Sequence, residues 1–166
     1  MTVKCYFYAR SHRPEPHRKG PGIIAFCIPD LGFAYRAALR ATPSELAYKA
    51  LMALLKFLES NPKVINRQKL QLHTDCAPLI YQVRGDMVAP PSVREDLGVI
   101  RLKKRQLGFT LNWVSEEENR ARENIVLQPI TRTAPKLNFS SLQDASFIQR
   151  VAGWPGKSPS ATRPKV

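Results

Sequence analysis

Basic side chains follow an apolar segment, VKCYFYA at residues 3–9, near the start of the chain. They are Arg10, His12, Arg13, Arg18 and Lys19. Guanidinium and ammonium groups gathered in this way suit contact with phosphate oxygens. Glu15 is the only acid between residues 10 and 19. Many enzymes place their first catalytic side chain where such a strand meets such a loop, and this sequence has a methyl group there, at Ala9.

Other residue types that do chemistry lack visible partners. His12 and His17 could each act as a general base, but each lacks a visible partner, so we expect solvated loop residues. His73 lies inside a predicted strand, where burial or cross-strand packing is the better expectation. Cys5, Cys27 and Cys76 are widely spaced without a CxxC pair. This argues against zinc and disulfides and predicts buried thiols in the cytoplasm.

The charge balance predicts the class of partner. The chain has 166 residues and a formal net charge of +13. A surface this basic favours polyanions such as nucleic acid or ribosomal RNA, because binding releases counterions. No apolar run reaches the length of a membrane span and the N-terminal residues lack a signal-peptide pattern, so we expect no membrane partner. A generally basic soluble protein is the alternative.

The elements expected first are three antiparallel strands and a long helix. The strands cover residues 3–9, 22–29 and 33–40, with a turn signal at Pro29, Asp30 and Gly32. The helix covers residues 42–60, because Thr42 is a good N-cap and Glu45 can close a capping box onto it.

The remaining elements alternate between helix and strand. A strand over 69–75 ends at Asp75, a short helix follows and stops at Gly85, and another helix covers 92–108. A strand over 109–114 precedes a last helix at 116–128, and Trp113 is expected in the core. The predicted order is β-β-β-α-β-α-α-β-α, a mixed α/β sheet with helices on its faces.

The composition changes after Pro129. Residues 129–166 are basic and rich in Pro and Ser, which predicts an extended tail. Within it, residues 140–152 have helical spacing and a Ser cap. We expect residues 140–154 to dock on a protein partner, and a helix that covers an edge of the sheet is the alternative.

Several pieces in order resemble the ribonuclease H family. They are KCYFYARS, GPGIIAF, TPSELAYKAL, LHTDCAPLIYQVRG and FTLNWVSEEENRARE, and they span about residues 3–127. The resemblance implies an α/β ribonuclease H-like fold, with a five-stranded mixed sheet in a domain of residues 1–128 and a C-terminal extension.

The same resemblance implies a chemistry that depends on four carboxylates. In this family they hold two Mg²⁺ ions that hydrolyse RNA in an RNA–DNA hybrid. The four positions fall at Ala9, Ala47, Asp75 and Glu123. We therefore expect a dismantled catalytic site with Asp75 and Glu123 as remnants, and no cofactor unless residual activity retains Mg²⁺.

Two readings of the remnants stay open. Asp75 is either a metal ligand or the N-cap of the helix that starts at Cys76. Glu123 is either a ligand or an ordinary surface acid. If both hold one metal ion, the protein is an active ribonuclease with a reduced site. A different basic, ribosome-associated fold is a third alternative.

The resemblance also implies a nucleic-acid face. It comprises the basic loop at 10–19, the helix start at Thr42 and Ser44, and the basic residues Lys103, Lys104 and Arg105. We predict a catalytically degenerate protein that binds RNA, an RNA–DNA hybrid or DNA, or a structural component of a ribonucleoprotein or replication assembly.

Overall fold

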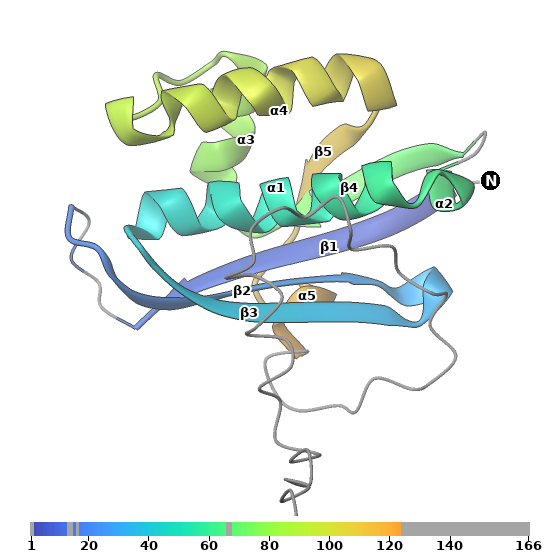
Figure 1. The fold of residues 1–166 in the computed structure, drawn as a ribbon, viewed down its shortest axis with the longest axis horizontal. Coiled ribbons are helices and arrows are strands. Elements are labelled where there is room, and N and C mark those ends of the chain that lie inside the picture. Colours follow the sequence, from blue (N-terminus) through green and yellow to red (C-terminus); the bar gives the residue numbers. More distant parts are fainter. Residues whose placement is uncertain (1, 13–14, 16, 66–67, 124–166) are drawn as a thin grey trace, which may run out of the picture.

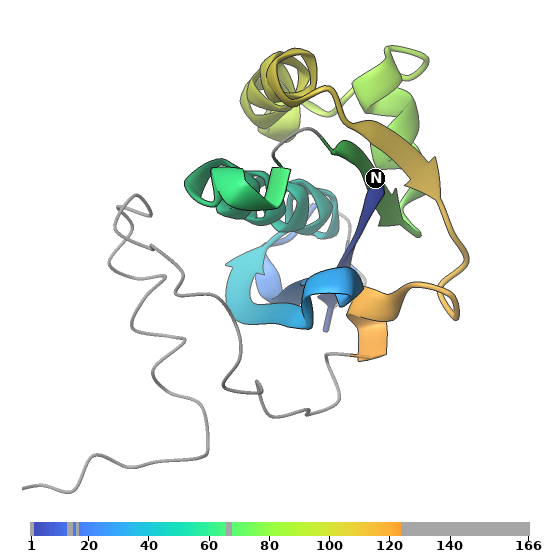
Figure 2. The ribbon, with the colours of Figure 1, turned by 90° about the vertical axis from the view of Figure 1, so that its right-hand side faces the viewer.

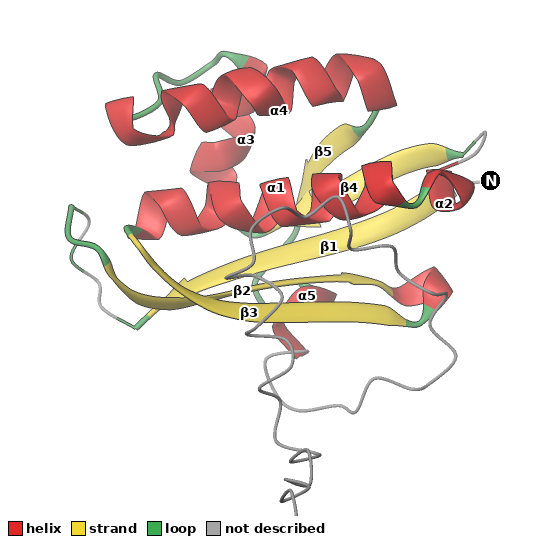
Figure 3. Ribbon diagram, in the orientation of Figure 1, coloured by secondary structure: helices red, strands yellow, loops and turns green. Residues whose placement is uncertain are grey.

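The computed structural model describes residues 2–12, 15, 17–65 and 68–123. Its five strands are β1 (Thr2–Ser11), β2 (Gly20–Ile28), β3 (Phe33–Ala41), β4 (Lys69–Thr74) and β5 (Thr110–Trp113). They form one sheet in the order β3-β2-β1-β4-β5 (Figure 3). The pairs β1/β2 and β2/β3 are antiparallel, and β1/β4 and β4/β5 are parallel. The predicted five-stranded mixed sheet is confirmed.

The helices complete the predicted order. They are α1 (Pro43–Ser60), α2 (Pro62–Ile65), α3 (Ala77–Arg84), α4 (Arg94–Leu107) and α5 (Arg120–Glu123). The four-residue α2 was not predicted from the sequence. Asn61 ends α1, and Pro62 then starts a new helical turn. Proline suits the first position of a helix because the backbone N–H that it lacks would have no partner there. Gly85 and Gly108 end α3 and α4 in the left-handed conformation.

The helices lie in layers around the sheet (Figures 1 and 2). Helix α1 crosses one face, α4 lies above α1, and α5 lies against the opposite face. Between α1 and the sheet is the main core, where the rings of Phe33 and Phe57 stack with centroids 4.3 Å apart. A second, smaller cluster holds Tyr8, Cys27 and Ala121 on the α5 side. We call that side, opposite α1, the far face.

The start of α1 is fixed by the predicted capping box. Thr42 Oγ1 accepts a hydrogen bond from the Glu45 backbone N–H at 3.3 Å, and the Thr42 N–H donates to Glu45 Oε2 at 2.8 Å. The first turn of α1 also approaches β2 closely, because a Cβ at Gly22 would lie 2.4 Å from Leu46 Cδ1. These contacts position the helix start beside the β1–β2 hairpin.

Two sequence expectations at the end of the domain were wrong. Trp113 is 60% exposed rather than in the core. The last helix begins at Arg120, not at residue 116, because Ser115 and Glu118 exchange hydrogen bonds and close a turn first. Residues 124–128, the tail at 129–166, its expected helix at 140–152 and its expected docking segment at 140–154 lie outside the described residues.

Among the described residues, none of the helices combines the length and the apolar character that a membrane span requires.

Candidate nucleic-acid interface

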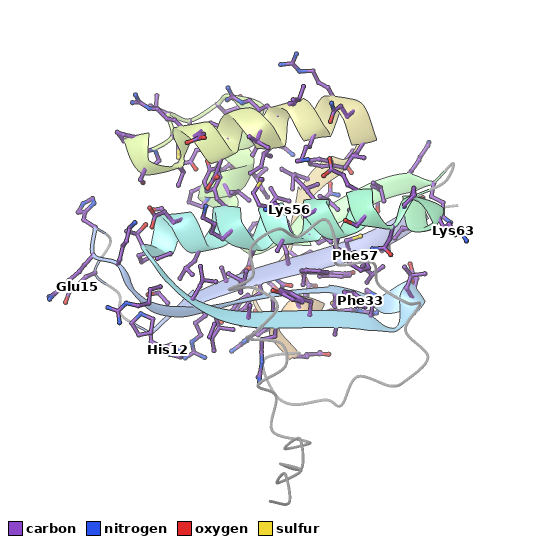
Figure 4. The ribbon with its side chains drawn as sticks, viewed as in Figure 1. His12, Glu15, Phe33, Lys56, Phe57 and Lys63 are labelled. Carbon is purple, nitrogen blue, oxygen red and sulfur yellow. The ribbon has the colours of Figure 1, made fainter. Side chains whose placement is uncertain are left out.

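The basic loop joins β1 to β2 at one end of the molecule. Figure 4 shows His12 and Glu15 there, at the end opposite Lys63. The His12 backbone N–H donates to the Pro21 carbonyl at 3.0 Å, which extends the hairpin beyond β1. Arg10, at the end of β1, is exposed. The hairpin therefore presents its cations to solvent.

Ion pairs hold part of this loop in place. Arg18 lies 3.6 Å from Glu15, and Lys19 lies 4.0 Å from Glu45 in the first turn of α1. The second pair joins the loop to the helix start, so the structure brings these two predicted parts of the interface together. Arg13 lies outside the described residues.

At the start of α1, the two predicted contact residues differ in access. Ser44 is exposed, whereas Thr42 is buried and its hydroxyl is engaged in the capping box. Ser44 can therefore meet a ligand directly, and Thr42 acts by fixing the helix start.

The basic residues of α4 lie elsewhere. Lys103 pairs with Glu59 in the last turn of α1, Lys104 is half-buried, and Arg105 is exposed. Glu45 and Glu59 are fourteen residues apart on one helix, which separates the two clusters by about 21 Å. The structure therefore does not join Lys103, Lys104 and Arg105 to the basic loop.

The positions that the family resemblance assigns to carboxylates are apolar in two places. Ala9 lies on β1 and packs against the main core, and Ala47 in α1 is 6% exposed within that core. Asp75 follows β4 and is half-buried, and Glu123 is exposed at the last residue of α5.

A buried amide, which sequence reasoning missed, engages Asp75. Asn119 is fully buried, and its Nδ2 donates to Asp75 Oδ1 at 2.9 Å and to the Phe7 carbonyl at 3.0 Å. Its Oδ1 accepts from the Ala121 N–H at 3.2 Å. Asn119 thus ties β1, the end of β4 and α5 together. The sequence feature that could have pointed to this role is the position of Asn119 at the start of the NRARE segment, residues 119–123.

The groups around Asp75 bias its ionisation. Burial raises the pKa of Asp75, the Asn119 hydrogen bond opposes that rise, and Glu116 adds to it. Glu116 in turn accepts from the Tyr8 hydroxyl at 3.1 Å and lies 3.3 Å from Arg122. Burial and the hydrogen bond to Glu116 raise the pKa of Tyr8.

The alternative role of Asp75 as a helix cap was wrong. Helix α3 has Cys76 as its N-cap residue, with no side-chain hydrogen bond to the helix start. The Cys76 N–H donates instead to Thr74 Oγ1 at 3.2 Å. The expectation for His73 is confirmed, because its ring stacks on Tyr6 of the neighbouring strand with centroids 4.9 Å apart.

In the part of the chain that the structure describes, no three side chains of His, Cys, Asp or Glu come together as a metal site would require.

Comparisons with known proteins identify the fold. No family model and no curated protein matches the sequence. LC11 ribonuclease H1, isolated from compost by a metagenomic approach, superposes with a TM-score of 0.65 at 20% identity, over 74% of this chain and 91% of that one. The same protein in complex with an RNA/DNA hybrid gives 0.63 at 19% identity, over 74% and 92%.

A third match comes from an archaeon. Ribonuclease H1 of Halobacterium salinarum has a TM-score of 0.55 at 21% identity, over 75% of this chain and 93% of its own. Together with the strand order and the helix on each face, these likenesses show that the chain has the ribonuclease H-like fold.

Proposed function

We propose that this protein binds nucleic acid through its basic surface, without metal-dependent hydrolysis, as a structural or assembly component of a nucleoprotein complex. One observation carries the proposal: the Asp75 carboxylate is hydrogen-bonded to the buried Asn119 amide, while Ala9 and Ala47 pack into the core. Asp75, one of the two acids left at the expected site, thus helps to hold α5 on the sheet.

The donor set does not fit a pair of Mg²⁺ ions. Mg²⁺ takes hard oxygen ligands in near-octahedral geometry, and a two-metal site needs several carboxylates that converge. Of the four positions that the resemblance implies, Ala9 and Ala47 carry methyl groups, and Glu123 is exposed. Of these four positions, only Asp75 offers a half-buried carboxylate, and Asn119 engages one of its oxygens.

The charge and the exposed loop support phosphate contact. The chain carries a net charge of +13, and Arg10, Arg18 and Lys19 are exposed at the hairpin end. Cations on long side chains contact phosphates without reading base sequence. The hybrid-bound ribonuclease H1 that shares this fold supports nucleic acid as the ligand class.

The proposed compartment is the cytoplasm. Cys5 and Cys27 are buried free thiols, and burial raises the pKa of Cys5 to about 12. Thiols of this kind fit a reducing compartment.

An active nuclease with a reduced site is the competing function. Its support is that Glu116 raises the pKa of Asp75, which places a second carboxylate near the first. In this alternative Asp75 and Glu123 hold a single metal ion, and the negative charge of Glu116 helps to attract it.

The test is a combined binding and cleavage assay with the full chain. An end-labelled RNA–DNA hybrid is incubated with the protein and Mg²⁺ or Mn²⁺. We expect binding that weakens steeply with salt, and no cleavage above background. Cleavage that disappears in the Asp75→Asn variant would overturn the proposal in favour of the nuclease.

A matched pair of variants tests the contact surface. Arg10→Gln/Arg18→Gln/Lys19→Gln removes three cations at the hairpin end, and Lys56→Gln/Lys63→Gln/Arg94→Gln removes three exposed cations elsewhere. We expect the hairpin variant alone to flatten the dependence of affinity on salt. Equal slopes in the two variants would mean that the basic loop is not a contact surface.

A further inference from the structure

The far face of the sheet carries a second set of cations. Side chains alternate along a strand, so every second residue of β1–β5 points away from α1. The cations at these positions are Lys4, Arg10, Arg36, Arg40 and Lys69. Within the five strands, all of which are described, no far-face position holds an acid. The charged side chains on the far-face positions of the strands are therefore all cations, and they come from β1, β3 and β4.

These cations lie at both ends of the face. Lys4 and Lys69 lie near the starts of the parallel strands β1 and β4. Arg10 and Arg40 lie at the hairpin end, where β2 pairs with both β1 and β3. Six residues of strand between Lys4 and Arg10 span about 20 Å. Because Arg10 also begins the basic loop, the far-face cations continue the hairpin surface.

Aromatic rings occupy the middle of the face. Tyr6 stacks on His73, and the Arg120 guanidinium lies 5.9 Å from the Tyr6 ring centroid. Burial lowers the pKa of His73, and the positive charge of Lys4 lowers it further by a smaller amount. Lys4 therefore lies close enough to this pair for its charge to act there.

Helix α5 and several acids limit where a polyanion can reach the far face. Asp30 lies in the turn between β2 and β3, and Glu116, Glu117 and Glu118 are exposed after β5. Glu116 accepts a hydrogen bond from Tyr8 on the far face, and α5, which ends at the exposed Glu123, lies against β1 and β2 there. A polyanion would therefore contact the exposed cations on either side of α5.

We propose that the far face is a second nucleic-acid contact surface, in which Lys4, Arg40 and Lys69 bind backbone phosphates in continuity with the hairpin loop. The inference rests on the proposed function and assigns it a further surface. Charge complementarity favours this occupant over residues 124–166, which hold more Lys and Arg than acids and would not neutralise the face.

The first test compares two triple variants of the full chain. Lys4→Gln/Arg40→Gln/Lys69→Gln removes three exposed far-face cations, and Lys56→Gln/Lys63→Gln/Arg94→Gln removes three from α1, α2 and α4. Affinity for a fluorescein-labelled RNA–DNA hybrid is measured from 50 to 300 mM KCl. Each lost phosphate contact lowers the slope of log K against log salt by about 0.9. We expect the slope to fall by about two to three for the far-face variant and to stay unchanged for the control.

The second test uses the unmodified protein. Lysines are acetylated with a water-soluble reagent, with and without saturating hybrid, and are quantified by mass spectrometry. We expect the hybrid to protect Lys4 and Lys69 while Lys56 and Lys63 still react. Equal protection of all four lysines, or none at Lys4 and Lys69, would overturn the inference.

The outcomes separate this inference from the proposed function. If the unmodified protein does not bind the hybrid, the proposed function fails. If it binds, and only the hairpin variant of Arg10, Arg18 and Lys19 changes the salt slope, the proposed function stands and the far-face surface is overturned.

Discussion

Asn119 donates one hydrogen bond of 2.9 Å to the Asp75 carboxylate and another of 3.0 Å to the Phe7 carbonyl. The same nitrogen thus joins β1, the residue after β4 and the segment that starts α5. Asn119 is fully buried, so its polar atoms depend on these partners within the protein. Asp75, one of the two acids left from the expected catalytic set, is therefore part of the packing of the domain.

The first prediction concerns this hydrogen-bond network. Asn119→Ala leaves the Phe7 carbonyl without its donor, and we expect a loss of about 1–3 kcal/mol in the free energy of unfolding. Asp75→Asn keeps an oxygen acceptor for Asn119, whereas Asp75→Ala removes it. Urea denaturation at pH 7 should give a stability equal to or above that of the wild type for Asp75→Asn and a clear loss for Asp75→Ala. Equal losses in the two Asp75 variants would show that the acceptor is not what matters.

The second prediction is a pH effect at Asp75. Burial raises the pKa of Asp75 from its usual value of 3.8, so the folded state binds the proton more tightly than the unfolded state. The protonated Asp75 therefore contributes its full share to the free energy of unfolding below pH 3.8. This contribution is lost as the pH rises from 3.8 through the higher pKa of the folded state. The difference in unfolding free energy between Asp75→Asn and the wild type should grow across this window. A difference that shrinks with rising pH would contradict it.

The third prediction is a pH effect of opposite sign at His73. Its pKa is lowered from 6.5 by burial and by Lys4, and both buried ring nitrogens lack a hydrogen-bond partner among the described residues. Stability contributed by the neutral ring is full above pH 6.5 and falls as pH drops below it. His73→Phe keeps the stack on Tyr6 without a titrating group. Thermal unfolding between pH 7.5 and 5 should show a smaller decline for His73→Phe, and an equal decline would refute the assignment.

The fourth prediction concerns the core position that the resemblance assigns to an acid. Ala47 is 6% exposed, so Ala47→Glu places a carboxylate among apolar side chains and should destabilise the domain by several kcal/mol. Ser44→Glu, on an exposed position in the same first turn, is the control and should be nearly neutral or slightly stabilising. Both are measured by urea denaturation. Similar stability for the two variants would mean that residue 47 is not enclosed.

The fifth prediction tests the contact between β2 and α1. A Cβ at Gly22 would lie 2.4 Å from Leu46 Cδ1 and 3.0 Å from the Arg10 carbonyl oxygen. Gly22→Ala should therefore cost about 1–3 kcal/mol through overpacking. Shortening Leu46 to Ala removes the nearer clash, so the double variant should be less destabilised than the sum of the two single variants. Strict additivity in this cycle would show that the two residues do not press on each other.

Local patterns in the sequence were enough to predict most of the helices and strands of the fold. Thr42 and Glu45 close the capping box that they predict, and Gly85 and Gly108 end their helices. These features depend on residues a few positions apart, where steric and hydrogen-bonding rules act directly. The start of α5 was mispredicted because acidic residues at 116–118 suit a helix, while the Ser115–Glu118 turn competes for the same backbone groups.

The sequence by itself determined that two expected carboxylate positions, Ala9 and Ala47, carry only methyl side chains, and that the chain is strongly basic. Residue type and net charge can be read without coordinates. Only the tertiary structure decided what Asp75 does, because its partner Asn119 is 44 residues away in the chain. It also separated Lys103 from the basic loop and gathered Lys4, Arg40 and Lys69 on one face. Strand register and helix packing determine which of these residues lie close together. Register and packing depend on contacts between residues that are remote in sequence.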